Sequence, residues 1–466
     1  MKEPVLKSLL VANRGEIALR IAATCQRLGI TPFFVYESAD QGLPHAKTKN
    51  SYNIQSYTDP EELIAVAKKL GVEGIHPGYG FISELPLFPK LTEEAGIEFI
   101  GPSSAAMARF GNKQEMLKGV SFIHLPRIPG VFVNIDDTDA ILDAADELHY
   151  PVIAKGKESA GGRHIKVNHS KEDLLANITD LRQGDIAEVY ISKFMTNVKH
   201  IEVQLLGDKR GRIVSLSTRD CSIQRRFQKL VEEAPAAPHS ISRGLQEEIE
   251  AAARRAGTLG GYINATTVEF LVDTKGNYYF MEANPRLQVE HTVTEEVYGI
   301  DLVEQQLRLA CGEQIDRSLQ DRRPMSHAIQ VRINAEDPFN DFSSSFGFIS
   351  GLKWPESTGG TKIRIDTFLE SNMALPQDYD SMVGKLVVVS TERTKTIKHL
   401  LDAIKDTRVE GIKTTLSLYE AITHHKVFQR GYHRTNFINL YLDDLLRDAT
   451  LCNMNKSIFL TNGAEN

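Results

Sequence analysis

The sequence predicts an α/β domain with a doubly wound parallel sheet at the N-terminus, followed by regions of the α+β class. Three observations carry this prediction: short apolar runs alternate with amphipathic segments in the first hundred residues, hairpin signals dominate the middle third, and the last third mixes strands with a helix. Alternating strands and helices favour a parallel sheet, whereas consecutive strands favour antiparallel pairing.

Within the first hundred residues, the apolar runs 9–12 and 33–36 are typical of buried strands. Residues 15–28 have a helical period, with Ile17 and Ile21 on one face. The run 9–12 is not followed by a GxGxxG fingerprint, so a dinucleotide site has little support.

A second helix is predicted to begin at Pro60. Asp59 can cap this helix, and proline suits its first turn. Short strands at Ile75 and at 99–100 complete the predicted sheet.

The middle third begins with a predicted strand at 151–155 and a glycine-containing loop at 156–163. Residues 170–173 (SKED) form a capping box that predicts a helix beginning there. In the run 201–205, apolar residues alternate with Glu202 and another polar residue, which predicts a half-buried strand.

Residues 268–281 are typical of a β-hairpin, because two apolar runs flank a DTKGN turn. The last third contains predicted strands at 327–334, 362–366 and 384–389, and a helix at about 394–405. These elements indicate a mixed α+β region.

Composition and charge exclude several classes of protein. A chain of 466 residues predicts about three domains, and 41% hydrophobic with 25% charged residues is typical of globular proteins. The net charge of −7 argues against general nucleic-acid binding. The apolar runs predict neither a membrane span nor a secretory segment. Four cysteines without CxxC spacing predict no zinc site and no disulfide framework, and favour the cytoplasm.

The densest group of chemically active residues lies at 282–290 (EANPRLQVE). On a strand, Glu282, Asn284 and Arg286 point the same way, and Glu269 on the preceding strand could face Glu282. Two carboxylates and an amide oxygen suit Mg²⁺, and an arginine beside them suits an anion. A solvated hairpin face with charge pairs explains the same spacing equally well.

A second group holds four cations between residues 219 and 229 in an otherwise acidic chain. This density is compatible with a pocket for phosphate or carboxylate. A solvated basic face balanced by Glu232 and Glu233 is the simpler interpretation of the residues alone. Cys221 is typical of a packed small side chain rather than of a nucleophile.

Two glycine-containing turns are weaker candidates. Lys155 with the loop to Arg163 could grip a phosphate, although the GxxxxGK[ST] pattern is absent and an ordinary surface hairpin fits as well. The turn at 76–81 (HPGYGF) follows the third predicted strand, so Tyr79 could cover a ligand or simply pack in a tight turn.

Taken together, these segments resemble the biotin carboxylase family, a branch of the ATP-grasp ligases, over nearly the whole chain. The motifs that carry the resemblance are 12–20 (ANRGEIALR), 76–84 (HPGYGFISE), 219–226 (RDCSIQRR), 282–291 (EANPRLQVEH), 332–338 (RINAEDP) and 379–385 (YDSMVGK). The resemblance implies an N-terminal domain at 1–112, a central ATP-grasp lid domain at 113–203, an ATP-grasp core at 204–325 and a C-terminal mixed α+β domain at 326–450. The composition predicts a polar tail at 451–466, and we expect fraying after about residue 447.

The resemblance also implies a reaction. Bicarbonate attacks the γ-phosphate of ATP to give carboxyphosphate, which collapses to CO₂ and phosphate. The phosphate deprotonates biotin, and the biotin enolate captures CO₂. ATP and Mg²⁺ (or Mn²⁺) are the implied cofactors, and biotin on a carrier protein is the implied substrate.

Residue roles follow from the matched motifs. The implied catalytic residues are Lys229, Arg286, Glu290 and Arg332, with Glu290 as the base for bicarbonate and Arg332 stabilising the enolate. Gln288 and Val289 would position bicarbonate, and Tyr79 would lie near biotin. The implied nucleotide-binding residues are Lys113, Lys155, Gly161, Gly162, Lys193, His200 and Gln224, and the implied metal ligands are Glu269, Glu282 and Asn284.

The departures from the family pattern lie in or near the nucleotide half. Glu158, Ser159 and Ala160 stand where the lid loop normally carries glycines, and the other departures are His164, Ser192, Thr218 and Phe227. A stiffer lid predicts altered use of ATP. A regulatory homologue that uses ATP weakly therefore stays an alternative, as does another ATP-grasp ligase that joins a carboxylate to an amine.

The chain contains no biotinylation site of the EAMKM type and no carboxyltransferase region. We therefore expect a separate subunit that acts on a biotin carboxyl carrier protein and works with carboxyltransferase subunits. A homodimer is expected from the resemblance, with neither a nucleic acid nor a membrane as partner. The final acceptor of the carboxyl group is not specified by the sequence.

Overall fold

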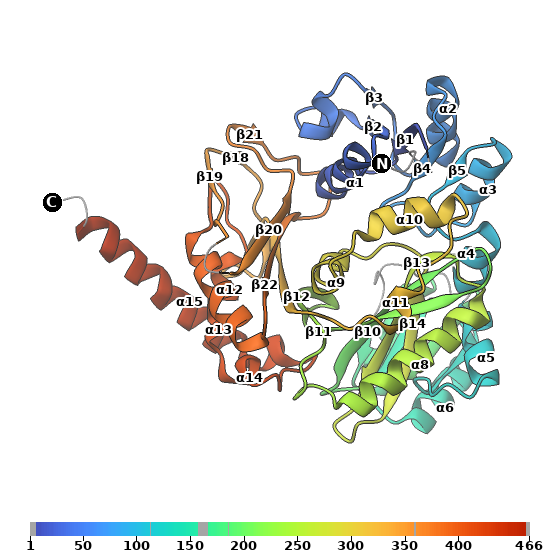
Figure 1. Ribbon diagram of the computed structural model, residues 1–466. Helices are drawn as coiled ribbons and strands as arrows, with labels where there is room; N and C mark the ends of the chain where they lie inside the picture. The colour runs from blue at the N-terminus through green and yellow to red at the C-terminus, as the bar shows by residue number, and fades with distance from the viewer. Residues whose placement is uncertain (1–5, 112, 157–165, 185, 358–359, 463–466) are drawn as a thin grey trace.

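The computed structural model describes residues 6–111, 113–156, 166–184, 186–357 and 360–462. It contains three main sheets, shown with their helices in Figure 1. The first two are a parallel N-terminal sheet and a small four-stranded sheet. The third is an antiparallel sheet of eight strands, which carries most of the candidate site. The helices of the described chain include none that is long and apolar enough to cross a membrane.

The N-terminal sheet is parallel throughout and has the strand order β3-β2-β1-β4-β5. This confirms the predicted doubly wound sheet. Asp59 caps the second helix by accepting hydrogen bonds from the N–H groups of Glu61 and Glu62, as expected. The elements are β1 (Ser8–Val11), α1 (Gly15–Leu28), β2 (Thr31–Tyr36), the 3₁₀ helices η1 (Ser38–Asp40) and η2 (Pro44–Lys47), β3 (Ser51–Asn53), α2 (Pro60–Leu70), β4 (Gly74–His76), α3 (Leu87–Glu94), β5 (Glu98–Phe99) and α4 (Ser104–Gly111).

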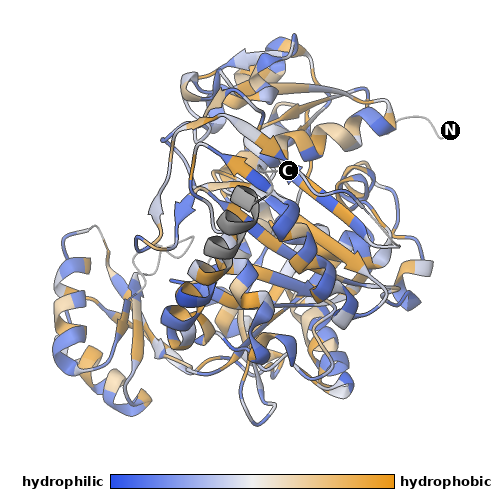
Figure 2. Cartoon of the chain, turned by 90° about the vertical axis from the view of Figure 1, so that its left-hand side faces the viewer, coloured by the Kyte–Doolittle hydropathy of each residue, from blue (hydrophilic) through white to orange (hydrophobic). Residues whose placement is uncertain are grey.

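The four-stranded sheet has the order β6-β9-β7-β8 and a small core of its own, in which Ile141, Leu174 and Ile191 are buried. Figure 2 shows apolar residues along its strands and on the helices beside them. Ser170 caps the second helix by accepting from the Asp173 N–H, which confirms the predicted cap. The elements are β6 (Gly130–Asn134), α6 (Thr138–Leu148), β7 (Val152–Gly156), β8 (Lys166–Asn168), α7 (Lys171–Leu181) and β9 (Glu188–Lys193).

The eight-stranded sheet has the order β14-β13-β10-β11-β12-β15-β22-β20, and every neighbouring pair is antiparallel. The strands are β10 (Lys199–Gly207), β11 (Ile213–Arg225), β12 (Gln228–Ala234), β13 (Asn264–Val272), β14 (Tyr278–Asn284), β15 (His327–Asn334), β20 (Lys362–Thr367) and β22 (Met382–Ser390). The boundary expected at residue 203 falls inside β10, and the boundary expected at 325 separates strands of one continuous sheet.

Helices cover this sheet, and three short ladders extend the C-terminal region. The helices are α5 (Lys113–Phe122), α8 (Arg243–Gly260), α9 (His291–Tyr298), α10 (Leu302–Ala310), α11 (Ser318–Asp321), α12 (Arg393–Asp406), α13 (Leu416–His424), α14 (Lys426–Gln429) and α15 (Phe437–Asn462). The ladders pair β16 (Glu336–Asp337) with β17 (Ser343–Ser344), β18 (Phe348–Ile349) with β21 (Met373–Ala374), and β19 (Gly351–Lys353) with β23 (Arg408–Glu410).

The far C-terminus differs from the expectation. The backbone is helical through Asn462, and α15 projects from the body of the molecule in Figure 1. The fraying expected after about residue 447 is therefore wrong for the described part of the chain, where α15 continues to Asn462.

Strand β10 also differs from the expectation of a half-buried strand, because all nine of its residues are buried. Its polar face packs around the guanidinium of Arg219, which is completely buried. Arg219 donates to Glu202 and to Gln204, the latter at 2.8 Å between Nη1 and Oε1. Alternating polar residues therefore face a buried charge rather than water.

Candidate active site

The centre of the candidate site is the ammonium of Lys229, at the start of β12. Its Nζ lies 2.6 Å from Glu202 Oε2 on β10, 3.1 Å from Glu269 Oε1 on β13 and 2.7 Å from Glu290 Oε1. Burial by itself lowers the pKa of Lys229, but the three carboxylates hold the pKa well above its usual value. The lysine therefore stays charged within the sheet.

Glu290 reaches this centre because it directly precedes α9, which packs across the middle of the eight-stranded sheet. Its other carboxylate oxygen lies 3.2 Å from Arg332 Nη2 on β15. Burial raises the pKa of Glu290, but the charges of Lys229, Arg332 and Arg219 hold the pKa well below its usual range. Glu290 is therefore an ionised carboxylate between two cations.

Arg332 is fixed by a second buried carboxylate. Its Nε lies 2.6 Å from Glu232 Oε1 on β12, and Gln330 donates to the other oxygen of Glu232 at 3.0 Å. Arg332 and Glu232 come from paired strands, since β12 and β15 are neighbours. The guanidinium thus connects Glu232 to Glu290 and retains donors that an anion could use.

The carboxylate of Glu269 accepts hydrogen bonds from side chains on several elements. Its two oxygens accept from His200 Nε2 at 2.6 Å and from Asn284 Nδ2 at 2.7 Å, and Gln288 Nε2 lies 3.3 Å away. Burial raises the pKa of Glu269, but Lys229 and His200 lower it to about 2. Glu269 is therefore ionised, with hydrogen-bond donors at both of its oxygens.

Glu282 lies directly opposite Glu269 in the β13–β14 ladder, which confirms the expected register. Residues paired across antiparallel strands project from the same face. The Glu282 carboxylate is exposed, whereas Glu269 and Asn284 are buried. The donor chemistry fits Mg²⁺, because these carboxylate and amide oxygens are hard ligands and an exposed carboxylate leaves room for a bound phosphate.

A second possible ligand group was not expected from the sequence. His200, Glu202 and Glu269 each have a ligand atom within 4.8 Å of the other two, and all three side chains are buried. Lys229 already pairs with both carboxylates. A cation in that position would have to compete with the ammonium, so the Glu269–Glu282 side is the better metal position.

Arg286 lies at the edge of the site, in the segment that follows β14. Its Nε contacts Glu84 Oε1 at 2.9 Å, and its Nη1 contacts the carbonyl of Leu287 at 3.2 Å. Glu84 belongs to the N-terminal domain, so this pair joins the parallel sheet to the centre of the site.

Tyr79 also comes from the N-terminal domain. Its hydroxyl donates to Glu16, and the ammonium of Lys385 lies 5.8 Å from the centre of its ring. Lys385 in turn donates to the carbonyl of Val289 at 3.0 Å. The side chain of Lys385 therefore lies between Tyr79 and the segment at 288–290.

The residues expected to bind the nucleotide are not brought together with Lys229, except for His200 and Gln224. Gln224 pairs with Lys229 in the β11–β12 ladder. Lys155 lies on β7 with its ammonium 6.0 Å from the ring of Tyr190, and Lys193 donates to the carbonyl of His149 at 2.6 Å. Gly161 and Gly162 lie outside the described residues, as does the side chain of Lys113.

The basic run at 219–229 is a mixture rather than a uniformly solvated face. Arg219 is buried and Lys229 is partly buried in the site, whereas Arg225 and Arg226 pair with Asp341 outside it. Phe227 is exposed at the turn between β11 and β12, with a backbone φ of 65°.

The sequence did not predict Glu202 or Glu232 as site residues, and it indicated Arg219 only as one of the four cations at 219–229. A glutamate that alternates with apolar residues in one strand is a weak signal, because such a residue faces water in most half-buried strands. Burial of Cys221 and the raised pKa of its thiol, caused first by desolvation, agree with a packed residue.

Three family models match consecutive parts of the chain. "Biotin carboxylase, N-terminal domain" matches residues 5–107, "Carbamoyl-phosphate synthase L chain, ATP binding domain" matches residues 112–318, and "Biotin carboxylase C-terminal domain" matches residues 330–440.

Curated relatives match over nearly the full chain. Biotin carboxylase 2 of Bacillus subtilis is 40% identical over 447 residues, which is 93% of this chain and 99% of that protein. A pyruvate carboxylase subunit of Methanothermobacter thermautotrophicus is 37% identical over 450 residues, which is 94% of this chain and 90% of that protein.

Solved structures show the same similarity. The biotin carboxylase domain dimer of Hydrogenobacter thermophilus 2-oxoglutarate carboxylase, in complex with MgADP, ADP and bicarbonate, matches with a TM-score of 0.88 and 35% identity, covering 94% of this chain and 98% of that chain. The biotin carboxylase of Campylobacter jejuni, in complex with β,γ-ATP, matches with a TM-score of 0.88 and 34% identity, covering 93% of this chain and 98% of that chain.

Proposed function

Because the chain belongs to the biotin carboxylase family, we propose that it uses ATP and bicarbonate to carboxylate biotin by way of carboxyphosphate. The observation that carries this proposal is the position of Glu290 between Lys229 and Arg332. A buried carboxylate flanked by two partly buried cations is suited to receive an anion and to accept its proton.

Glu290 is proposed as the base that deprotonates bicarbonate. In the absence of an anion its pKa is held well below the usual range, which makes it a weak base. A bound bicarbonate would share the charges of Lys229 and Arg332 and add a negative charge beside Glu290. Both effects raise the pKa of Glu290, so binding itself prepares the carboxylate to accept the proton.

Arg286 and the segment at 288–289 are proposed to orient bicarbonate. A guanidinium presents donors in a planar fork that matches a carboxylate, and a fixed backbone amide adds directional specificity. Arg332 is proposed to stabilise the biotin enolate once carboxyphosphate has decomposed. Its two partners, Glu232 and Glu290, hold its guanidinium in place without occupying all of its N–H donors.

Glu269, Glu282 and Asn284 are proposed to hold the Mg²⁺ that accompanies the nucleotide. A bound Mg²⁺ would neutralise phosphate charge at the end of the eight-stranded sheet. His200 keeps Glu269 ionised and oriented, since its Nε2 lies 2.6 Å from the carboxylate. Lys113, Lys155, Gly161, Gly162, Lys193 and Gln224 are proposed to contact ATP.

The chain is proposed to work within a larger carboxylase. The relative from M. thermautotrophicus is named as one subunit of a carboxylase, and the H. thermophilus domain was solved as a dimer. We therefore propose a homodimer that carboxylates biotin on a carrier protein and passes the carboxyl group to a carboxyltransferase.

The test is ATP hydrolysis by the purified protein with free biotin as acceptor. The expected result is hydrolysis that requires bicarbonate and increases with biotin. Hydrolysis that requires neither compound, but instead an amine and another carboxylate, would favour a different ATP-grasp ligase. Calorimetric titration with MgATP tests the alternative of a regulatory homologue. Such a protein would bind MgATP weakly and show no turnover at saturating bicarbonate.

A further inference from the structure

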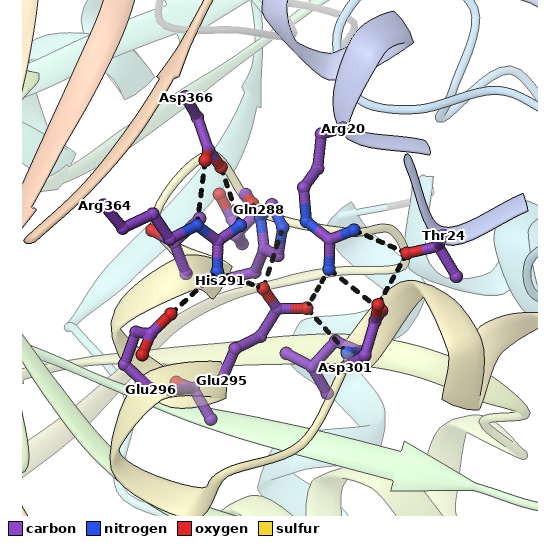
Figure 3. A network of polar contacts seen from close by, with 12 residues as sticks. Arg20, Thr24, Gln288, His291, Glu295, Glu296, Asp301, Arg364 and Asp366 are labelled. Atoms are coloured by element: carbon purple, nitrogen blue, oxygen red, sulfur yellow. Dashed lines mark hydrogen bonds and ion pairs between the residues drawn. The ribbon is translucent and has the colours of Figure 1, made fainter. Parts of the chain in front are cut away.

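Two consecutive backbone carbonyls in the segment at 288–289 are held by buried side chains behind the site. His291 Nδ1 lies 2.7 Å from the carbonyl oxygen of Gln288, and Lys385 Nζ lies 3.0 Å from the carbonyl oxygen of Val289. Both side chains are completely buried. Figure 3 shows Gln288 and His291 within the surrounding polar network.

His291 donates to Gln288 as a neutral imidazole. A carbonyl can only accept, so the proton of this hydrogen bond is on Nδ1. Burial, followed by the charges of Lys385 and Arg20, holds the pKa of His291 well below its usual value. Nε2 has no hydrogen-bond partner among the described residues and lies 3.9 Å from Glu295 Oε2, so the bond to Gln288 is the ring's one hydrogen bond within that part of the chain.

Lys385 is a buried ammonium whose charge is balanced from the N-terminal domain. Its Nζ lies 3.0 Å from Glu16 Oε1 on α1 and 4.0 Å from Asp366 Oδ2 on β20. Removing a charge from water is costly unless it is paired and hydrogen-bonded. The charged Lys385 side chain therefore holds the carbonyl of Val289, the residue directly before Glu290.

A chain of ion pairs fixes the groups behind His291 and Lys385. Arg364 joins Asp366 at 2.7 Å to Glu295 at 2.8 Å, and Arg20 joins Glu295 at 2.6 Å to Asp301 at 2.9 Å. Figure 3 shows these side chains converging from α1, α9, β20 and the residue before α10. They link α9, which begins directly after Glu290, to α1 and β20.

We propose that His291 and Lys385 are positioning residues for bicarbonate, because they fix the peptide units of Gln288 and Val289 and thereby the placement of the Glu290 carboxylate. This inference deepens the proposed function and depends on it. We assign neither residue a contact with the substrate. Each acts through the backbone, which holds Glu290 within reach of Lys229 and Arg332. Misplacement of a reacting group by about 1 Å can cost about 100-fold in rate.

The first experiment compares Lys385→Met, Lys385→Arg and the control Lys362→Met in the full-length protein. Lys362 lies on β20 and pairs with Glu296 at 2.7 Å, but its side chain is mostly exposed. Lys385→Met is expected to raise the KM for bicarbonate by about tenfold or more while the KM for ATP changes less than about twofold. Lys385→Arg should retain more activity than Lys385→Met, and Lys362→Met should resemble the parent protein.

The second experiment compares His291→Asn with His291→Gln, and it decides the matter if Lys385→Met does not fold. An asparagine amide can replace the Nδ1 donor, whereas a glutamine amide extends to the position of Nε2. The KM for bicarbonate is therefore expected to be lower in His291→Asn than in His291→Gln.

Three results overturn the inference. They are equal bicarbonate KM values for the two His291 variants, parallel changes in the KM for ATP and bicarbonate, and a bicarbonate KM within about twofold of the parent for Lys385→Met. A parent protein that shows no bicarbonate-dependent hydrolysis contradicts the proposed function instead, so the two failures are distinguishable.

Discussion

The ammonium of Lys229 lies 2.7 Å from the carboxylate of Glu290, and the two residues come from separate elements, the start of β12 and the residue before α9. Arg332 holds the second oxygen of the same carboxylate. An entering anion has to share these cations with Glu290. In the proposed mechanism, anion binding and activation of Glu290 as the base are therefore coupled by the same charges.

Replacing Glu290 by glutamine should abolish the bicarbonate-dependent part of ATP hydrolysis, with a loss of about 100- to 10,000-fold. MgATP binding should survive, because Glu290 contacts Lys229 and Arg332 rather than the residues expected at the nucleotide. Steady-state hydrolysis with and without bicarbonate, together with calorimetry, measures both quantities. Exposed Glu247 on α8 offers a control, Glu247→Gln, which should leave both unchanged. Full bicarbonate-dependent activity in Glu290→Gln would show that another group takes the proton.

The two proposed metal ligands should respond differently to removal of their charge. Glu282→Gln should raise the Mg²⁺ concentration for half-maximal activity by about tenfold without changing the melting temperature, because Glu282 is exposed. Glu269→Gln should also lower the melting temperature, since Glu269 is buried against Lys229 and His200. Mg²⁺ titrations and thermal melts measure these effects. An unchanged Mg²⁺ requirement in Glu282→Gln would remove this residue from the metal site.

The altered lid loop should weaken ATP use. Glu158, Ser159 and Ala160 lie outside the described residues, so this prediction depends on their chemistry alone. Glycine permits close approach of the backbone to phosphates, and a glutamate adds negative charge near an anionic nucleotide. Replacing all three residues by glycine should lower the KM for ATP and leave the KM for bicarbonate nearly unchanged. A KM for ATP that stays constant or rises would show that the substitutions are compensated nearby.

Acid should destabilise the fold partly through His76. Burial lowers the pKa of this histidine from 6.5 to about 4. The unfolded chain therefore takes up a proton as the pH falls through 6.5, whereas the folded protein resists protonation until about pH 4. The free energy of unfolding should fall across this window, by about 3 kcal/mol in total.

The test for His76 is the slope of stability against pH, measured by urea unfolding between pH 7 and 4. His76→Asn should reduce this slope by an amount that corresponds to the uptake of at most one proton on unfolding, whatever its effect on stability at neutral pH. His76 Nδ1 accepts from the Gly78 N–H at 3.0 Å, and an asparagine oxygen can take over that bond. An unchanged slope would mean that His76 does not titrate differently in the folded and unfolded states.

Local features of the sequence were sufficient to predict many of the elements. Helix α1 occupies the expected residues 15–28, and Asp59 and Ser170 cap the expected helices. The hairpin of β13 and β14 also has the expected pairing of Glu269 with Glu282. These features depend on periodicity and on side chains that bond to the backbone within a few residues. Such interactions are encoded in short segments.

The sequence by itself therefore determined the family motifs, the local elements and the identity of Glu290 as the proposed base. Only the tertiary structure decided that Glu202 and Glu232 are buried partners of Lys229 and Arg332, and that Lys385 supports the backbone at Val289. The physical reason is that the period of a strand shows which residues share a face but not what covers that face. Here the cover is supplied by strands and helices that are distant in the sequence.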